Sequence, residues 1–453
     1  MQTAGFDRKN ISSIRPVFDR DRPKLYIETY GCQMNVNDSE VVAAIMQNAG
    51  YSVTKDIGDA NLILINTCSV RDNAEQRIWG RLEYFRLEKK KRPDVSIGVI
   101  GCMAERLKES LLENNVVDIV SGPDAYRELP KLVEKTESGQ KGINVLLSRD
   151  ETYADISPVR LDKTGVTAFI SIMRGCNNVC AFCVVPYTRG GERSRNPETV
   201  IRELKELSDN GYKEVTLLGQ NVDSYSWNGV AFADLLATVA ESTPDMRIRF
   251  STSHPKDMTD NVLKTMAKYD NICNYIHLPV QSGSTSILQS MNRKYTREEY
   301  LQRIETIRKI IPDCAISTDI IAGFCGETQK DHEDTLSLMR EVGYDFAYMF
   351  KYSERPNTKA ARQFRDDVPE EVKVKRLMEI IDLQSELSLA SHKKDIGSTL
   401  EVLVEDTSKR SENDLCGRTP QNKMVVFPKE NRKIGDLIKV KIIACTQATL
   451  KGK

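Results

Sequence analysis

Three cysteines within eight residues, with no fourth beside them, constrain this chain more than any other feature of its sequence. They lie in the run Cys176-Asn177-Asn178-Val179-Cys180-Ala181-Phe182-Cys183, which has the spacing C-x3-C-x2-C. A cubane iron–sulfur cluster normally takes four thiolates, so three thiolates leave one iron open. Catalytic metal sites keep an open position, whereas structural sites are closed. The run therefore indicates chemistry at iron rather than electron storage alone.

A structural zinc site is the alternative interpretation of the same run. Zinc would require a fourth Cys or His close by. Between residues 160 and 250 there is none, and the nearest downstream histidine is His254. Phe182, beside the third thiol, would shield a cluster and offer it an aromatic face. The sequence favours iron–sulfur over zinc.

A second set of three cysteines is spread over the first quarter of the chain. Cys32, Cys68 and Cys102 each follow a predicted strand, at intervals of roughly one strand–helix–strand unit. Ligands of open α/β sheets bind outside the carboxyl ends of the strands, so these three thiols are expected to meet at one edge. The alternative is three buried core cysteines, since free Cys is often buried. Identical placement on three strand ends favours a shared site.

Length and composition place the chain among multidomain proteins of ordinary charge. A chain of 453 residues is expected to form two to four domains. Lys+Arg and Asp+Glu both total 65, so any RNA-binding surface must be a local patch. Eleven cysteines without a signal peptide or an apolar membrane span favour a reduced, cytoplasmic location.

The alternation of apolar strands and amphipathic helices predicts an α/β protein with three folded parts. The first is a doubly wound parallel-sheet domain, the second a partial (β/α)6 barrel, and the third a small all-β barrel with a mild basic excess. The predicted divisions are a flexible tail at 1–22, the first domain at 23–142, a linker at 143–164, the barrel at 165–392 and the β domain at 393–453. In the barrel, strands are expected at 168–174, 214–219, 247–251, 275–280, 315–321 and 344–350.

Long motifs surround both sets of cysteines. They are Gly31-Cys32-Gln33-Met34-Asn35, Asn66-Thr67-Cys68-Ser69-Val70-Arg71, Gly101-Cys102-Met103-Ala104-Glu105-Arg106 and the segment from Met173 to Arg195. Together they resemble the radical S-adenosylmethionine (SAM) methylthiotransferases, most closely the MiaB family that acts on tRNA. The resemblance covers about residues 24–453. One departure is Cys325, where such enzymes usually have Pro; we interpret it as a packing variant and not a ligand.

The resemblance implies a domain order, two cofactors and a reaction. The domains would be an N-terminal methylthiotransferase domain, a radical SAM domain and a C-terminal TRAM domain. Cys176, Cys180 and Cys183 would hold one [4Fe–4S] cluster that binds SAM, and the other three cysteines an auxiliary [4Fe–4S] cluster that supplies sulfur. SAM would be used twice, once as a methyl donor and once to generate the 5′-deoxyadenosyl radical. The methylthio group would join C2 of N6-isopentenyladenosine at tRNA position 37.

Further site residues follow from strand ends and from the resemblance. Those expected to contact SAM or substrate are Phe182, Gly219, Gln220, Ser251, Ser253, Gln281, Arg293, Asp319 and Phe350. Those expected to contact RNA are Arg189, Arg193, Arg195, Arg418, Asn422 and Phe427. For each of the polar SAM and substrate candidates taken alone, a capping or loop-stabilising role is an equal alternative.

The resemblance also implies partners and leaves related activities open. Expected partners are the tRNA anticodon stem-loop, a flavodoxin- or ferredoxin-like electron donor and cluster-assembly proteins, with the chain acting as a monomer. Related enzymes act on threonylcarbamoyladenosine in tRNA or on an aspartate of a ribosomal protein. From outside the family, the alternatives are an RNA-binding electron carrier with two clusters and a zinc-stabilised RNA-binding scaffold.

Overall fold

The computed structural model describes residues 16, 19, 21–69, 72–162 and 164–453, with the side chains of 72–74 excepted. The chain divides into two compact units. The first comprises Met1–Ser148 and Tyr153–Lys163, and the second Arg149–Thr152 and Thr164–Lys453. Most of the predicted tail at 1–22 lies outside the described residues.

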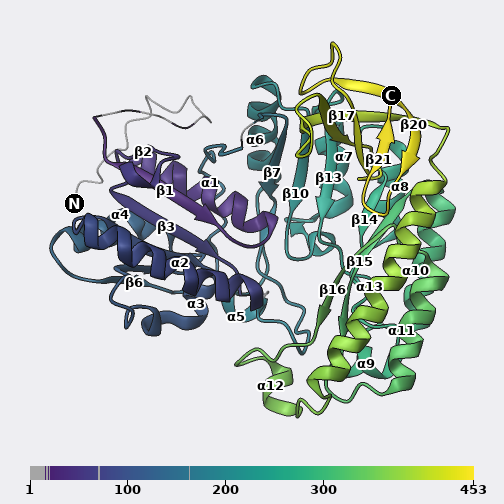
Figure 1. Cartoon of the computed structure of the whole chain (residues 1–453), viewed down its shortest axis with the longest axis horizontal. Helices are drawn as coiled ribbons and strands as arrows, with labels where there is room; N and C mark the ends of the chain where they lie inside the picture. Colours follow the sequence, from purple (N-terminus) through teal and green to yellow (C-terminus); the bar gives the residue numbers. More distant parts are fainter. Residues whose placement is uncertain (1–15, 17–18, 20, 70–71, 163) are drawn as a thin grey trace. The chain divides into compact units, whose positions relative to one another are not determined.

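The first unit contains one six-stranded sheet in which every pairing is parallel. Its strand order is β2-β1-β3-β4-β5-β6, and Figure 1 labels β1, β2, β3 and β6 of this sheet. The strands are β1 Lys24–Thr29, β2 Ser52–Val53, β3 Leu62–Thr67, β4 Ser96–Gly101, β5 Ile119–Ser121 and β6 Gly142–Asn144. The helices are α1 Gln33–Asn48, α2 Asp72–Lys91, α3 Cys102–Leu107 and α4 Leu129–Glu137.

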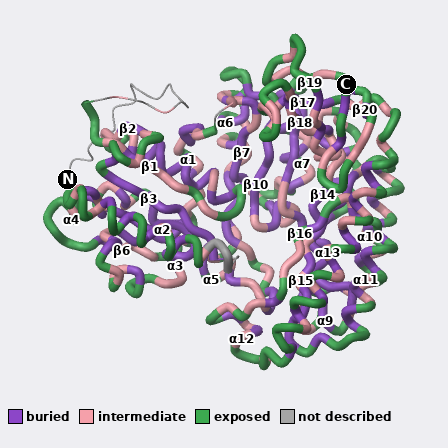
Figure 2. The backbone as a smooth tube through the Cα atoms, viewed as in Figure 1, coloured by how far each residue is buried: buried purple, intermediate pink, exposed green. Residues whose placement is uncertain are grey.

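Both faces of this sheet are covered, as the doubly wound prediction requires. Along β3, Ile63 and Ile65 pack with Ile78, Leu82 and Phe85 of α2 on one face. Leu62 and Leu64 face the other way, toward α1 and α4. Successive side chains of a strand point to opposite faces, so a strand buried on both faces is apolar throughout. Figure 2 shows β3 coloured as buried, in agreement with the burial of every residue of this strand.

The first unit extends beyond the predicted boundary at residue 142. The short strand β6 pairs with β5, and Tyr153–Lys163 belongs to the same compact unit. The hydroxyl of Tyr153 donates to the Pro123 carbonyl, and Arg160 forms a buried ion pair with Glu40 at 2.7 Å. Much of the segment 143–164 is therefore folded onto this domain instead of serving as a linker.

The second unit begins with six parallel strands of a partial barrel. They are β7 Thr167–Ser171, β10 Glu214–Leu218, β13 Arg247–Ser251, β14 Tyr275–His277, β15 Ala315–Ala322 and β16 Phe346–Lys351. They form two three-stranded sheets, joined where Ile248 bridges to Ile272 and Cys273 N–H bonds to the Ile248 carbonyl. The six predicted strands are thus confirmed.

Helices alternate with these strands, and short two-residue strands lie between them. The helices are α5 Val185–Arg189, α6 Pro197–Asp209, α7 Phe232–Ser242, α8 Asp260–Lys268, α9 Thr285–Ser290, α10 Arg297–Ile310, α11 Gln329–Val342, α12 Lys359–Gln363 and α13 Glu370–Lys393. The short strands are β8 Met173–Arg174, β9 Arg193–Ser194, β11 Ser226–Trp227 and β12 Val230–Ala231. The predicted start of α6 is confirmed, because the Asn196 side chain accepts from Glu198 N–H and Pro197 is the first helical residue.

The chain ends in a closed five-stranded barrel of order β17-β18-β19-β21-β20. Its strands are β17 Thr399–Thr407, β18 Asp414–Arg418, β19 Met424–Pro428, β20 Leu437–Cys445 and β21 Leu450–Gly452. The sequence pattern predicts three of these strands and misses β18 and β21. Closure leaves no free sheet edge, so the small domain gains a continuous core around Val402, Val425 and Phe427.

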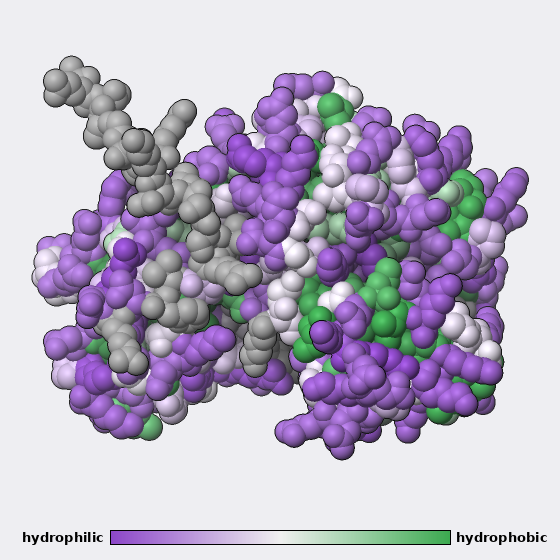
Figure 3. Space-filling model, turned by 90° about the horizontal axis from the view of Figure 1, so that it is seen from above, coloured by the Kyte–Doolittle hydropathy of each residue, from purple (hydrophilic) through white to green (hydrophobic). Residues whose placement is uncertain are grey.

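The surface of the described residues is mostly hydrophilic in the view of Figure 3, with hydrophobic residues in limited patches. Among these residues, no helix is both long enough and apolar enough to cross a membrane.

Candidate active site

The cysteine loop of the second unit leaves β8 through a glycine that no other residue could replace without strain. Gly175 has φ +76°, and a Cβ on it would lie 2.0 Å from the Gly191 carbonyl oxygen. The same close approach allows Cys176 N–H to bond the Gly190 carbonyl at 3.1 Å. The loop is thus fixed against the Gly190-Gly191 turn at the carboxyl side of the barrel.

Backbone N–H groups point at two of the three thiols. Asn178 N–H donates to Cys176 Sγ and Val185 N–H donates to Cys183 Sγ, both at 3.4 Å. Burial raises the pKa of Cys176 to about 11 and that of Cys183 to about 12. Both thiols are therefore neutral by themselves, and a bound cationic centre is needed to hold them as thiolates.

Arg293, in the turn between α9 and α10, contacts the remaining thiol of the loop, that of Cys180. Its Nη1 lies 3.3 Å from Cys180 Sγ, its Nη2 donates to the Pro279 carbonyl and its Nε to the Tyr295 hydroxyl. Arg293 is 5% exposed, so its charge acts on the sulfur with little screening by water. Arg293 thus lies against the cysteine loop, and its contact with SAM or substrate stays a prediction.

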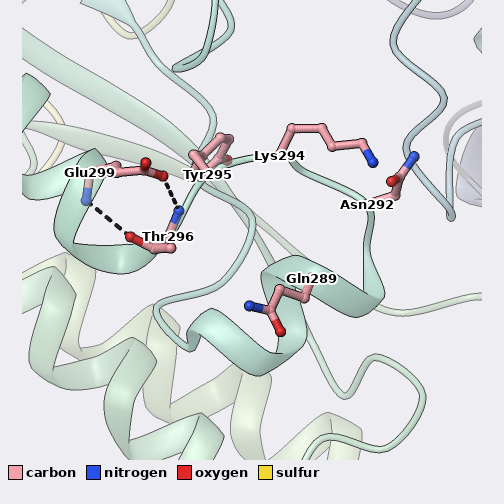
Figure 4. A pocket seen from close by; sticks show the side chains of 6 residues that line it. All are labelled: Gln289, Asn292, Lys294, Tyr295, Thr296 and Glu299. Atoms are coloured by element: carbon pink, nitrogen blue, oxygen red, sulfur yellow. Dashed lines mark hydrogen bonds between the residues drawn. The ribbon is translucent and has the colours of Figure 1, made fainter.

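A cavity of about 420 Å³ lies beside the same turn. Its lining residues are Gln289, Asn292, Lys294, Tyr295, Thr296 and Glu299 (Figure 4). The Asn292 amide donates to the Val179 carbonyl of the cysteine loop at 2.8 Å, while Thr296 and Glu299 cap α10 reciprocally. The turn is therefore anchored both to the loop and to its own helix.

Asp257 connects the cysteine loop to the end of β10. Its Oδ2 accepts from the side-chain amides of Asn178, at 3.2 Å, and Asn221, at 2.7 Å. The neighbouring Lys256 donates to Asn178 Oδ1 at 3.3 Å. Sequence reasoning assigned no role to Asp257, Asn178 or Lys256, because their spacing along the chain gives no sign that they meet; Asn221 was considered only as part of the Gly219-Gln220-Asn221 strand end.

Several buried polar atoms at the ends of β10 and β13 lack a partner. They are Gln220 Oε1, Asn221 Oδ1 and His254 Nε2. Lys256 N–H donates to His254 Nδ1, so the ring proton of the neutral imidazole belongs on Nε2. Burial, together with Arg293 and Lys256, lowers the pKa of His254 to about 2, which keeps the ring neutral. Buried polar groups are normally satisfied, so this donor and these acceptors fit a polar ligand such as the amino acid part of SAM.

The remaining predicted cofactor residues fall into two groups. The backbone of Gly219 is engaged with β13, and its missing side chain accommodates Met173, so packing accounts for this glycine. Ser251, Ser253, Gln281, Asp319 and Phe350 lie at or near the carboxyl ends of their strands, where they were expected. Phe182 packs against the apolar cluster that contains Cys325 and Phe324. The interpretation of Cys325 as a packing residue agrees with this position.

In the first unit, the other three cysteines follow adjacent strands. Cys32 precedes α1 after β1, Cys68 directly follows β3 and Cys102 directly follows β4. These strands are neighbours in the sheet order, so the three thiols lie at one edge, as predicted. Gly31 and Gly101 have φ of +139° and +92°, and neither has room for a Cβ. A Cβ added to Gly31 would lie 2.7 Å from the Cβ of Cys68.

An asparagine pair holds this edge together. The Asn35 amide donates to Asn66 Oδ1 at 3.0 Å and to the Thr67 carbonyl, while Asn66 donates to the Asn35 carbonyl. Both side chains are fully buried, and Cys32 Sγ donates to Asn35 Oδ1 at 3.2 Å. The pair fixes the start of α1 to the end of β3, and with it the spacing of Cys32 and Cys68.

Neither cysteine set is gathered around a single ion. Among the described residues, no three His, Cys, Asp or Glu side chains converge closely enough to hold one metal ion. A structural zinc would need four ligands at about 2.0–2.3 Å from one point.

The structure corrects part of the predicted RNA contact. Phe427 is 1% exposed in the core of the C-terminal barrel, so its ring has no face for a base. Arg195 is 4% exposed and is paired with Glu203 at 2.7 Å and with the Ser171 carbonyl. Sequence proximity to the cysteine loop suggested phosphate binding, but this guanidinium is occupied within the barrel. For Arg189 and Arg193, RNA contact stays a prediction.

The predicted RNA loop at 418–422 instead packs on the amino ends of the barrel strands. Arg249 of β13 donates to the Thr419 and Pro420 carbonyls at 2.7 and 2.9 Å. Arg418 and Arg249 both approach Glu214 of β10, at 3.3 and 2.9 Å, and Glu214 is fully buried. Asn422 accepts from Arg418. Arg418 and Asn422 are therefore held at the amino ends of the barrel strands, and RNA contact by either residue stays a prediction.

Three family models match the chain, each on one of its folded parts. They are an uncharacterised protein family, UPF0004, at residues 24–122, the radical SAM superfamily at 170–339 and the TRAM domain at 393–453. A partial barrel with a three-cysteine loop and a radical SAM match defines the class: the chain is a radical SAM enzyme, a class that uses a [4Fe–4S] cluster and SAM.

Relatives narrow this class further. A tRNA-2-methylthio-N(6)-dimethylallyladenosine synthase from Phocaeicola vulgatus is 56% identical, covering 100% of this chain and 99% of its own. One from Amoebophilus asiaticus is 57% identical, covering 95% and 92%. The chain belongs to the tRNA-2-methylthio-N(6)-dimethylallyladenosine synthase family.

Solved structures share the fold at low identity. The radical SAM methyltransferase TsrM from Kitasatospora setae has a TM-score of 0.57 and 14% identity, covering 75% of each chain. The cobalamin-dependent radical SAM enzyme OxsB has a TM-score of 0.52 and 13% identity, covering 81% of this chain and 56% of its own. These likenesses support the fold alone.

Proposed function

We propose that this chain attaches a methylthio group to C2 of N6-isopentenyladenosine (N6-dimethylallyladenosine) at position 37 of tRNA. The observation that carries the proposal is the full-length identity to synthases of that product. The sulfur would come from an auxiliary cluster and the methyl group from SAM. Two separate sets of three cysteines, each one thiol short of a closed cubane, support a reaction that needs two open irons.

The six cysteines divide between two clusters in this proposal. Cys176, Cys180 and Cys183 would hold the cluster that binds SAM, whose electron transfer to SAM supplies the 5′-deoxyadenosyl radical. Cys32, Cys68 and Cys102 would hold the auxiliary cluster. Arg293 would keep Cys180 oriented, and Asp257 would hold the loop through Asn178. His254 Nε2–H would donate to an acceptor atom of SAM at the end of β13.

For tRNA, the C-terminal barrel offers a basic face. Lys439 and Lys441 of β20 are exposed and alternate with buried Val440 and Ile442. Lys451 of the neighbouring strand β21 is also exposed. Lysines on one face of adjacent strands would bind phosphates irrespective of sequence. We assign the TRAM contact to this face in place of the loop at 418–422.

The proposal includes two further kinds of partner and a quaternary state. Reduction of the SAM-binding cluster needs a one-electron donor, for which a flavodoxin- or ferredoxin-like protein is suited. Cluster-assembly proteins would load and rebuild the clusters, and the chain would act as a monomer.

Two variants test the separate roles of the two cysteine sets. With dithionite, SAM and an isopentenylated anticodon stem-loop under anaerobic conditions, Cys180→Ala should form no 5′-deoxyadenosine. Cys68→Ala should still cleave SAM but form no methylthiolated product. Normal product from Cys68→Ala would refute the auxiliary cluster, and absence of product from the unsubstituted chain would refute the function itself. Mass spectrometry measures 5′-deoxyadenosine in the reaction mixture and the methylthiolated nucleoside in the digested RNA.

A further inference from the structure

Three aromatic residues lie at alternate positions along the last strand of the partial barrel. Phe346, Tyr348 and Phe350 of β16 pair with Ser317, Asp319 and Ile321 of β15. Because paired residues of neighbouring strands point to the same face, these side chains share one surface with His277 of β14, which pairs with Ser317. The opposite face of β15 and β16 carries Ile316, Ile320 and Ala347, which are buried. The aromatic residues therefore line the inner face of the barrel.

Two of these aromatic rings are unusually exposed. Phe346 is 48% and Tyr348 is 42% exposed, although both lie on a sheet whose other face is core. Their rings meet edge to face at 4.9 Å, and Tyr348 also meets the His277 ring edge to face at 5.7 Å. Aromatic rings that are held in place by neighbouring side chains and still remain exposed are typical of a surface that binds a ligand.

Polar groups stand directly beside the rings. His277 Nε2 lies 3.4 Å from Asp319 Oδ1, and its Nδ1 hydrogen-bonds the Ser317 hydroxyl at 2.8 Å. An aromatic face with hydrogen-bonding groups at its border is the arrangement by which proteins hold unpaired RNA bases, which stack on the ring and bond through their edges.

We propose that Phe346 and Tyr348 form a stacking platform for an unpaired base of the anticodon loop of the RNA substrate. The inference rests on the proposed function, because it takes RNA as the substrate. Phe350 continues the same stripe to the carboxyl end of β16, the side of the barrel that carries the cysteine loop. A base on the platform would place the anticodon loop inside the barrel and hold the target nucleotide near the SAM site.

Binding of two anticodon stem-loops tests the platform. One carries N6-isopentenyladenosine at position 37 and the other unmodified adenosine, and fluorescence anisotropy measures the dissociation constant of each. Phe346→Ala and Tyr348→Ala should each weaken binding of both RNAs by about 5-fold to 150-fold, the usual effect of losing one stacked base. Tyr348→Phe keeps the ring and should retain binding.

Met378→Ala is the matched control, since Met378 is 51% exposed on α13, away from this face, and its loss should not change binding. Thermal unfolding and iron content verify that each variant is folded. Unchanged binding by both alanine variants would overturn the proposal. So would a loss seen only with the isopentenylated RNA, because the aromatic face would then hold the prenyl group and not a base. Failure of the unsubstituted chain to make methylthiolated RNA would instead count against the proposed function.

Discussion

Arg293 Nη1 lies 3.3 Å from Cys180 Sγ, so a buried guanidinium touches one of the three sulfurs of the cysteine loop. Two further donors of the same side chain bond the Pro279 carbonyl and the Tyr295 hydroxyl, which fix its plane. The residue is thus a positioning residue that also places positive charge beside the cluster site.

Replacing Arg293 by Gln should weaken the site without unfolding the barrel. Loss of a residue that orients a metal ligand typically costs about 10- to 100-fold in affinity or activity. The reduced cluster is the more negative state, so removal of a nearby positive charge should also lower the reduction potential. An EPR-monitored redox titration, with 5′-deoxyadenosine formation as a second readout, measures both effects. A potential equal to that of the unsubstituted protein would contradict the electrostatic role.

Asp257→Ala should loosen the cysteine loop. The change leaves the amides of half-buried Asn178 and buried Asn221 without their shared acceptor, at a cost of about 1–3 kcal/mol for the buried donor of Asn221. We expect faster loss of iron to a chelator and slower SAM cleavage. Asp257→Asn keeps one acceptor oxygen and should recover part of both, whereas equal iron loss in the two variants would contradict the bridging role.

Gly175→Ala tests the entry to the loop. At φ +76° an added Cβ would be strained and would collide with the Gly191 carbonyl oxygen at 2.0 Å. The loop must shift, so the variant should lose the SAM-binding cluster and keep the proposed auxiliary cluster. Iron analysis should fall from about eight to about four atoms per chain. Gly211→Ala offers a control for positive φ alone, since Gly211 has φ +86° and nothing within 4 Å of an added Cβ.

Sequence patterns predicted the six barrel strands well, because each is an apolar run bounded by turns and followed by an amphipathic helix. They missed β2 and β6, which have two and three residues and carry too little periodicity. The six cysteines lie after the strands that were expected to precede them, because the positions of strands and cysteines along the chain are both local signals.

Sequence patterns could not predict contacts between residues that are far apart along the chain. Phe427 was expected to face RNA, yet Met424–Pro428 alternates half-buried and buried positions, and the inward position of Val425 could have indicated that Phe427 is core. Asp257 and the platform residue Tyr348 meet their partners only through the tertiary fold. For Tyr348, the alternation Phe-x-Tyr-x-Phe on β16 was a signal that sequence reasoning did not use.

Glu214→Gln should destabilise both the amino end of the partial barrel and the C-terminal domain. The change removes the charge that Arg249 and Arg418 share, and breaking a buried ion pair by removal of one partner costs about 3–5 kcal/mol. Urea unfolding should show a lower midpoint, with the C-terminal barrel released first. Lys205→Gln, on the exposed side of α6, serves as a control. Unchanged stability of Glu214→Gln would mean that the two arginines find other partners.

Asp331 should make stability depend on pH at the acid end. Burial favours the neutral carboxyl, but hydrogen bonds from Ser284, Thr328 and Ser286 outweigh it and lower the pKa of Asp331 to about 2. Since the unfolded chain binds this proton more tightly, the contribution is complete above about pH 4 and is lost as pH falls toward 2.

The Asp331→Asn variant isolates this contribution. It should be less stable than the unsubstituted protein by about 2 kcal/mol at pH 7. At pH 3 this difference in stability should fall to about half. Half of it remains because the native carboxylate at pH 3 still binds its proton more weakly than the unfolded chain does. Urea unfolding of the apoprotein at both pH values measures the gap. A gap of the same size at pH 3 and pH 7 would show that geometry, and not ionisation of Asp331, joins the first turns of α9 and α11.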